Sequence, residues 1–254
     1  MTKKAFLTGS LSTGILFSLW SLAAHIMAAP FILPTPETVF ADSFRLVQTP
    51  SFISTLSATG ARGCVAFCIS LVFSVILGLP SGLSDTFSTA LNPWMTVIKA
   101  TPVVAFILIA LLWFGSSIVP VFVSILMTLP VMTEAIAQGV RSSDRNLLAM
   151  ARVYHFRRRD ILLHIQLPSA LPYFLGGAGA SLGLTWKVVV AGEILSSPHL
   201  GIGSAMQTAK VHLETPRVFS LTLTAIFLSI LTELLFNFLV RLTGRRSGKK
   251  TGEA

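Results

Sequence analysis

Long apolar runs constrain this chain more than any other feature of its sequence. A helix needs about 20 predominantly apolar residues to cross the hydrocarbon core of a bilayer. Six windows come close to this length, at residues 7–29, 61–82, 93–114, 117–138, 172–195 and 218–241. Of the 254 residues, 53% are hydrophobic and 11% are charged, and the mean hydropathy is +0.77. The sequence therefore predicts an all-α, polytopic membrane protein with six transmembrane helices in a single domain over residues 1–254, with its core at about 55–241.

The composition argues against several other classes of protein. The net charge of +9 could suggest nucleic-acid binding, but the basic residues flank the apolar windows and do not alternate with stacking aromatics. Cys64 and Cys68 lie four residues apart in an apolar window, which favours small-residue packing over a disulfide or a metal pair. The first window could pass for a signal peptide, but five further windows favour an uncleaved first span.

The distribution of basic residues predicts the orientation. With a cytoplasmic amino terminus, segments 1–6, 83–92, 139–171 and 242–254 lie inside, and they hold most of the 19 Lys and Arg residues. The opposite side holds only Arg45, Arg62, Lys210 and Arg217. Because cytoplasmic loops carry an excess of Lys and Arg, we expect both termini to be cytoplasmic.

One inner segment, "ARVYHFRRRDILLHIQLPSALP" (residues 151–172), is strongly basic. Its pattern predicts two short amphipathic helices with a bend near His155, since His tolerates a left-handed backbone better than bulky residues do. Pro168 is expected to end the second helix, and Pro172 to lie in the first turn of the next span. Such a pair of helices can lie on anionic lipid or insert into a groove on a partner protein.

The same segment resembles the cytoplasmic coupling loop of permease subunits of binding-protein-dependent ABC importers. That family's signature is Glu-Ala-Ala, three residues, Gly, nine residues, then Ile-x-Leu-Pro. Here "IQLP" supplies the closing half, His155 stands in the place of the Gly, and Ala149, Met150 and Ala151 stand in the place of Glu-Ala-Ala.

Further stretches resemble the branch of this family that imports nitrate, sulfonates, taurine and some vitamin precursors. They are "ILPTPETVF", "FISTLSATGAR", "KATPVVAFILIALLWFG", "TWKVVVAGEIL" and "GIGSAMQTAK", in the family's order. The resemblance implies a type I importer permease of MetI-like fold in the inner membrane, working as a homodimer with two ATPase subunits and an external substrate-binding protein. Its segment at residues 196–217 would be re-entrant or lie against the outer face.

The resemblance also implies roles for the residues of the coupling loop at 139–171. Tyr154 and Phe156 are expected as anchors in the ATPase groove, and Arg152, Arg157 and Arg158 as ion-pair partners. The alternative is that these arginines only set topology and contact lipid headgroups. The full expected coupling set is Ala149, Met150, Ala151, Arg152, Tyr154, His155, Phe156, Arg157, Arg158, Ile165, Leu167 and Pro168.

The chain is expected to bind no cofactor itself, with ATP and Mg held by the partner ATPase. "TGRRSGKKTG" resembles a P-loop, but only three residues separate Gly244 from Gly248, and Lys250 intervenes before Thr251. "GASLG" (residues 179–183) imitates the nucleophile elbow of hydrolases, but it lies in an apolar, helix-like run. Its small residues are better suited to close helix packing. We expect no enzymatic activity.

Charged residues within the apolar windows indicate function, because a charge in the middle of a span is costly and usually faces a cavity. Lys187 follows Trp186 in the fifth window, and with Glu193 these residues are expected along the translocation pathway, where an ammonium would favour an anionic substrate. The alternative for Lys187 is a structural ion pair. Glu134 and Glu233, assigned near the ends of their spans, are expected to be structural.

Two other classes of function remain to be weighed. An ion-coupled secondary transporter would use intramembrane charges, but it would also show an internal repeat, which this sequence lacks. A lipid-binding scaffold would have no use for several intramembrane charges. The resemblance favours a small anion, such as nitrate, a sulfonate or taurine, or a vitamin precursor as substrate.

Overall fold

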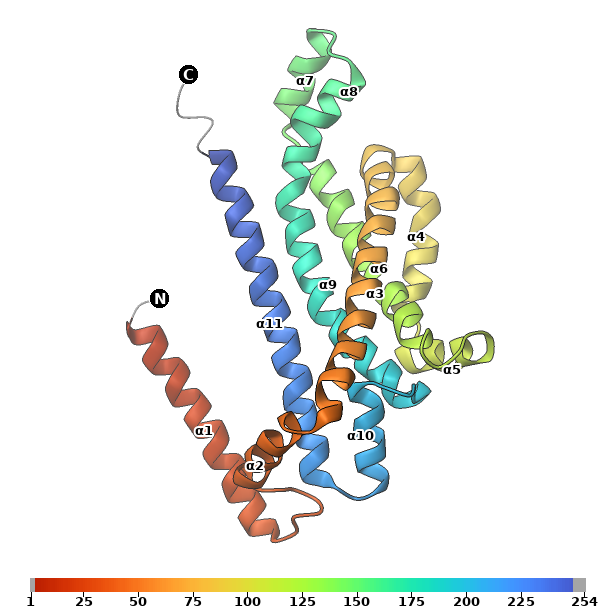
Figure 1. The fold of residues 1–254 in the computed structure, drawn as a ribbon. Helices are drawn as coiled ribbons and strands as arrows, with labels where there is room; N and C mark the ends of the chain where they lie inside the picture. Colours follow the sequence, from red (N-terminus) through yellow and green to blue (C-terminus); the bar gives the residue numbers. More distant parts are fainter. Residues whose placement is uncertain (1–2, 249–254) are drawn as a thin grey trace.

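The computed structural model describes the backbone of residues 3–248 and the side chains of residues 11–242. Every regular element in this part of the chain is helical, as the sequence predicted (Figure 1). The basic tail with the P-loop resemblance, from residue 243 onward, lies outside the described side chains. The elements are α1 (Lys3–Met27), α2 (Pro36–Val47), α3 (Pro50–Leu83), α4 (Asp85–Ala100), α5 (Val103–Trp113), α6 (Val119–Arg141), α7 (Arg145–Val153), α8 (Arg158–Ile161), a π-helical turn η1 (Leu162–Gln166), α9 (Leu167–Ser196), α10 (Ile202–Val211) and α11 (Thr215–Gly248).

Four of the described helices are long and apolar enough to cross a membrane. They are Pro50–Leu83, Val119–Arg141, Arg158–Ser196 and Thr215–Leu242. The pair α4 and α5 qualifies as a fifth span if it is counted as one broken helix, and Leu11–Met27 of α1 is a shorter apolar helix. Each of the six predicted windows thus contains a described helix. At most five of these windows hold a helix with the length and composition of a full span.

The third predicted span, 93–114, is wrong in its bounds and shape. Its helix begins at Asp85, where Ser84 caps the first turn by accepting a hydrogen bond from the backbone N–H of Phe87 at 3.3 Å. Residues predicted as an inner loop, 83–92, therefore lie mostly in α4. The chain then bends by 97° between α4 and α5, because Thr101 precedes Pro102 and takes an extended conformation that ends the helix.

The second helix of the basic segment does not end at Pro168, contrary to the prediction. The helix runs from Arg158 through to Ser196, and Pro172 lies inside it. The backbone N–H of Leu167 reaches the carbonyl of Leu162, five residues earlier, within the turn η1. A proline ring crowds the carbonyl four residues before it in a regular α-helix, and this wider turn relieves the crowding just before Pro168.

The core lies where α6 packs between α3 and α9. Small residues bring the backbones close: a Cβ at Gly78 of α3 would lie 2.8 Å from Cβ of Ile136, and one at Gly177 of α9 would collide with Ala135. Hydroxyl groups pair within this interface, as where Thr128 donates to Ser70 at 2.8 Å. Close approach through small residues and hydroxyl hydrogen bonds is how helices associate without a hydrophobic driving force.

The run containing "GASLG" lies inside α9 and contributes to the same close packing, as predicted. Gly179 is in van der Waals range of Phe236 on α11, at 3.7 Å for an added Cβ. Cys64 and Cys68 behave differently from the prediction: both are free and exposed on α3, so they do not pack within this chain.

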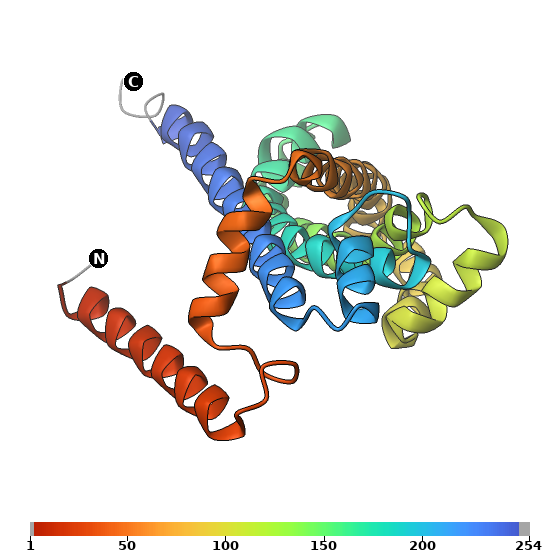
Figure 2. The same ribbon diagram turned by 60° about the horizontal axis from the view of Figure 1, so that its bottom comes forward.

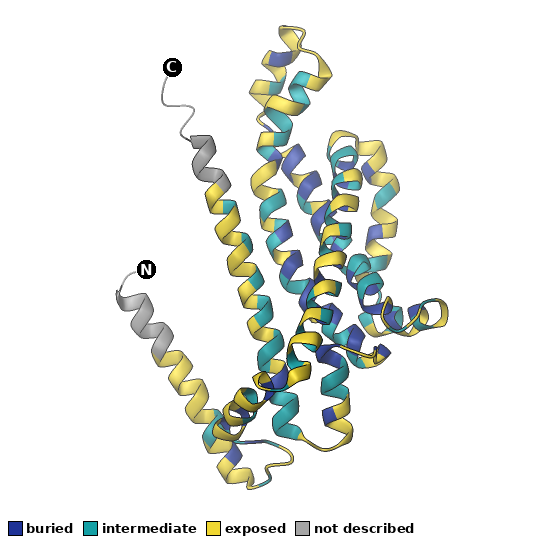
Figure 3. Ribbon diagram, viewed as in Figure 1, coloured by how far each residue is buried: buried dark blue, intermediate teal, exposed yellow. Residues whose placement is uncertain are grey.

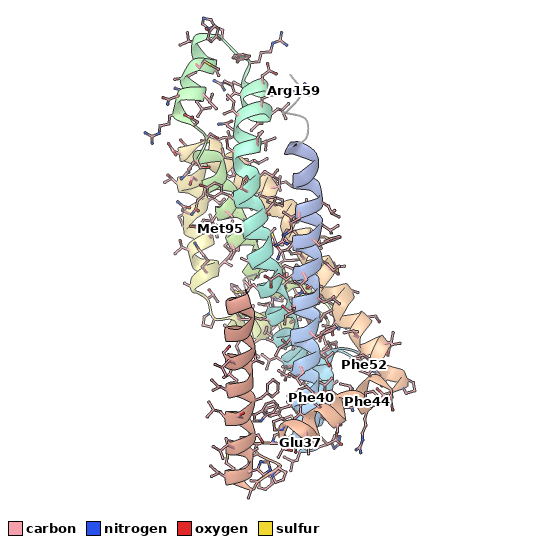
Figure 4. All side chains as sticks on the ribbon, turned by 90° about the vertical axis from the view of Figure 1, so that its left-hand side faces the viewer. Glu37, Phe40, Phe44, Phe52, Met95 and Arg159 are labelled. Carbon is pink, nitrogen blue, oxygen red and sulfur yellow. The ribbon has the colours of Figure 1, made fainter. Side chains whose placement is uncertain are left out.

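α1, α2 and α11 form the periphery of the molecule. Viewed from the end that carries α2 and α10, α1 stands away from the bundle (Figure 2). It is held through Trp20, whose Nε1 donates to the carbonyl of Pro34 at 3.1 Å. Phe17 of α1 also packs on Phe40 of α2, at 5.8 Å between ring centroids. Figure 4 labels Phe40 among the side chains of the structure. α11 exposes apolar side chains along most of its length, and buried residues concentrate in α6 and α9 (Figure 3).

Candidate functional sites

A hairpin formed by α7 and α8 projects beyond the rest of the bundle (Figure 1). Asp144 starts α7 by accepting a hydrogen bond from the N–H of Asn146 at 2.7 Å. The helix ends in a Schellman motif: the N–H of Phe156 reaches the carbonyl of Ala151 at 2.9 Å, and that of His155 reaches Arg152 at 3.1 Å. His155 takes the left-handed position with a φ of 54°. The predicted bend near His155 is confirmed.

The hairpin displays most of its predicted coupling side chains. Tyr154 is 72% exposed and Phe156 53% exposed, whereas Ala151 is buried. Arg152 and Arg158 line a hollow of about 610 Å³ that reaches Leu83 at the end of α3. Within the described residues, Arg152, Arg157 and Arg158 form no ion pair with a carboxylate. Farther along the helix, Ile165 and Leu167 are half-buried and Pro168 is exposed; Ala149 and Met150 are exposed on α7.

A buried carboxylate ties three helices together at the end of the bundle opposite the hairpin. Glu193 of α9 is fully buried, and its Oε1 lies 2.6 Å from Nη1 of Arg62 on α3. Thr59, one turn earlier on α3, donates to both carboxylate oxygens, at 3.0 and 2.9 Å. The same guanidinium donates to the carbonyl of Leu200 at 2.7 Å. The charge of Glu193 is thus compensated inside the protein.

The first turn of α10 is the third partner of this carboxylate. The N–H of Gly203 donates to Glu193 Oε2 at 2.9 Å, and that of Ile202 donates to Thr59 Oγ1 at 2.8 Å. These are two of the donors that a helix start leaves unpaired. Glycine permits the approach: a Cβ at Gly201 would lie 2.7 Å from Glu193 Cδ, and one at Gly203 would collide with the carbonyl of Val190. The segment that the family resemblance implied to be re-entrant or to lie against the outer face thus holds α10, a helix fixed to the bundle.

The three residues expected along the translocation pathway have different environments. Trp186 is 3% exposed, and its Nε1 donates to Thr232 Oγ1 on α11 at 2.7 Å. Lys187 is exposed at a mostly apolar hollow of about 440 Å³ between α9, α10 and α11. No described carboxylate pairs with Lys187, and Glu193 pairs with Arg62 instead. Their roles in translocation stay predictions.

The remaining charges within the spans also differ from one another. Glu134 of α6 pairs with Lys99 of α4 at 2.9 Å, with both side chains about half exposed. Glu233 was assigned near the end of its span, but α11 continues to Gly248, so Glu233 lies near the middle of the helix. It is exposed, and no described residue forms an ion pair with it.

Sequence comparison assigns the chain to a family. Residues 70–248, more than half of the chain, match the family described as "Binding-protein-dependent transport system inner membrane component". The protein belongs to this family of inner-membrane permeases. The taurine transport system permease protein TauC of Escherichia coli K12 is 28% identical over 85% of this chain and 80% of its own length. The putative aliphatic sulfonates transport permease protein SsuC of the same organism is 30% identical over 78% and 76%.

The fold is shared with a solved structure. A chain of the MetNI methionine ABC transporter, captured in inward-facing conformations, aligns with a TM-score of 0.63 at 13% identity, covering 77% of this chain and 99% of its own. The all-α, MetI-like fold inferred from the sequence is confirmed. The chain is a transmembrane transport subunit of a multi-pass inner-membrane family, whose permeases work with a cytoplasmic ATPase and a substrate-binding protein. This favours the ATP-driven importer over an ion-coupled secondary transporter.

Sequence reasoning missed Arg62 and Thr59 as partners of Glu193. The signal was present: Arg62 lies near the start of one apolar window and Glu193 near the end of another that runs the opposite way, so the two lie at similar depth. Counting residues from the same boundary would have given the two a similar depth, although it does not show that their spans are neighbours. The contact with α10 could not be found in this way, since it depends on where the chain folds back after Ser196.

Proposed function

We propose that this permease carries small sulfonates across the inner membrane, including taurine, a zwitterion whose sulfonate group is anionic. The proposal is supported by two relatives, which match over 80% and 76% of their own length and are named for taurine and aliphatic sulfonates. An unpaired ammonium at a hollow within the spans, that of Lys187, is suited to attract an anion where water is scarce. The chain itself carries out no covalent chemistry.

The energy is supplied by two copies of a cytoplasmic ATPase, which bind ATP and Mg and grip the α7–α8 hairpin. The coupling surface consists of the exposed aromatic side chains of Tyr154 and Phe156 with the unpaired arginines beside them. Aromatic and Arg side chains are the residues that most often carry binding energy in protein interfaces. Both termini and the hairpin lie on the cytoplasmic side, as the excess of Lys and Arg indicates.

Two copies of the chain form the pathway, and an external substrate-binding protein docks on the face that carries α10. A second copy is supported by the unpartnered apolar surface of the molecule. None of the residues in the most apolar window of α11 is buried, and α1 extends from the bundle with exposed side chains such as Leu16 and Ile26. In a homodimer, surfaces of this kind become helix–helix contacts.

Reconstitution tests this function. The permease, its ATPase and its binding protein would be placed in liposomes, and uptake of radiolabelled taurine and ethanesulfonate would be followed with and without internal ATP. We expect ATP-dependent uptake that other small sulfonates compete with. Uptake driven by an ion gradient without ATP would contradict the proposal, as would exclusive transport of solutes that carry no anionic group.

A further inference from the structure

A second hollow, far more polar than the one at Lys187, lies between α4 and α6. Its volume is about 200 Å³. On α4 the polar lining recurs at helical spacing, and α6 faces it with a second set of polar side chains. The polar lining residues are Ser88, Asn92, Thr96 and Lys99 of α4, Thr133, Glu134, Gln138 and Arg141 of α6, and Ser81 at the end of α3.

This stripe of polar side chains lies within helices of membrane-spanning character. Glu134 comes seven residues before the end of α6, a rise of about 10 Å. Lys99 and Glu134 have side chains that are 47% and 54% exposed. Half-exposed charges at such positions do not face lipid, because a charge in a span faces a bundle interior or a water-filled cavity. The α4–α6 surface therefore borders water or the other half of a pathway.

One buried hydroxyl group at the hollow has no partner among the described residues. Thr133 is 3% exposed and lines the hollow, yet its hydroxyl has no hydrogen-bond partner in the structure. Nearly all buried polar groups in proteins are hydrogen-bonded, to protein or to ordered water. A ligand or water within the hollow would complete the partners of Thr133.

The charges of the lining favour an anion. Lys99 and Arg141 are cationic, and Glu134 is the one acidic side chain among the lining residues. Arg141 is held at the hairpin end, where it donates to the carbonyl of Ser81 at 2.9 Å and lies 3.6 Å from Asp85. Among the described residues, the ammonium of Lys99 forms an ion pair with Glu134 and with no other carboxylate. An arriving anion can compete with Glu134 for this ammonium without breaking another ion pair.

We propose that the α4–α6 hollow is a binding site for a small anion within the translocation pathway, with Lys99 as the anion-binding cation and Glu134 as its resting counter-charge. The inference rests on the proposed function, because it takes the transported anion as the occupant. Thr133, Asn92 and Thr96 supply neutral hydrogen-bonding groups around that anion. Gln138 and Arg141 continue the polar surface toward the hairpin end.

Cysteine labelling in the assembled importer tests the site. In membrane vesicles carrying the permease with its ATPase, Cys64 and Cys68 would be replaced by Ala, and Thr96 or Val97 by Cys. Val97 is a matched control, since it is exposed on the same helix but does not line the hollow. Each variant would be treated with an anionic and a cationic methanethiosulfonate reagent, both water-soluble, and the labelling rates compared.

We expect the Thr96→Cys protein to be labelled and the Val97→Cys protein to be protected by lipid. The anionic reagent should react at Thr96→Cys about tenfold faster than the cationic one, relative to their rates with a free thiol, because a cationic cavity raises the local anion concentration. Lys99→Gln should abolish this preference, and Glu134→Gln should increase it. A Lys99–Glu134 pair that faced away from the hollow would leave the preference unchanged in both variants.

Added taurine should slow labelling of Thr96→Cys in vesicles that take it up. Equal labelling of Thr96→Cys and Val97→Cys overturns the inference, and so does labelling without charge preference. Both results are independent of the transported solute. If the proposed function fails because sulfonates are not transported, the reagent preference still decides whether the hollow is an anion site.

Discussion

The guanidinium of Arg62 and the carboxylate of Glu193 lie 2.6 Å apart, although the two residues belong to different spans and lie 131 positions apart in the sequence. The pair is nearly enclosed, with side chains that are 13% and 0% exposed. Because Glu193 also accepts from Thr59 and from the start of α10, this one carboxylate holds α3, α9 and α10 in register.

Replacement of Arg62 by Met is expected to destabilise the protein by about 3–5 kcal/mol, since it leaves a buried carboxylate without its counter-charge. The double variant Arg62→Met/Glu193→Met should recover much of this loss, because a buried ion pair is often replaced by apolar residues at little cost. Thermal unfolding in detergent, followed by size-exclusion fluorescence, measures both. Equal unfolding temperatures for the single variant and the wild type would contradict a structural role for the pair.

Gly203 is expected to tolerate no side chain. A Cβ there collides with the carbonyl of Val190 and lies 2.6 Å from Cβ of Glu193, so Gly203→Ala should cost about 1–3 kcal/mol and separate α10 from the bundle. Gly183→Ala on α9 is the control, because no atom of this chain lies within 4 Å of the added Cβ. That change should be neutral or stabilising by up to about 1 kcal/mol. Protease sensitivity of the α9–α10 connection reports the difference.

The hairpin turn predicts opposite effects for two substitutions of His155. Gly is the residue best suited to its φ of 54°, so His155→Gly should preserve ATPase retention and favour the hairpin by about 1 kcal/mol. His155→Val should weaken retention, because a β-branched residue is strained in this conformation. Co-purification of the ATPase with a tagged permease measures both. Loss of the ATPase in the Gly variant would show that the imidazole itself makes the contact.

Charge reversal on the hairpin tests the grip of the ATPase. The pair Arg152→Glu and Arg157→Glu should reduce co-purification of the ATPase about tenfold or more, since like charges across an interface cost several kcal/mol. Charge reversal at the exposed Arg241 on α11, by Arg241→Glu, is the control for a general effect of charge on membrane insertion. Unchanged retention in the double variant would assign the hairpin arginines to topology and lipid contact.

Lys187 provides a fifth prediction. No described carboxylate pairs with it, so Lys187→Gln should leave the unfolding temperature unchanged while it lowers sulfonate uptake about tenfold through lost attraction for the anion. A structural role would give the reverse pattern, with lower stability and normal uptake.

Sequence patterns predicted the elements whose cause is local. The apolar windows located the long helices, and the tolerance of His155 for a left-handed backbone located the hairpin turn. Patterns failed where one residue has two possible effects. Pro168 was expected to stop a helix, yet the turn η1 carries the helix past it, whereas Pro102 does break the third span. Hydropathy does not separate these cases, because the outcome depends on what each backbone packs against.

The candidate sites also differ in how far the sequence predicts them. The hairpin could be recognised from a contiguous signature, since its residues are neighbours in the chain. The pairs Arg62–Glu193 and Lys99–Glu134 join helices that the sequence leaves unpaired, and each needed a relative placement of spans that periodicity does not provide. The lack of an ion-pair partner for Lys187 is likewise visible only once the neighbouring helices are in place.

The helix from Arg158 to Ser196, including the turn η1, has 39 residues and a length of about 58 Å, so it joins the α7–α8 hairpin to the junction at Glu193. A tilt applied at the hairpin would displace α10 at the far end without any rearrangement of side chains in between. The turn η1 is where this helix is most easily bent, since its regular hydrogen-bond ladder is interrupted there. The stiffness of those five residues would then set how far α10 moves when an ATPase moves the hairpin.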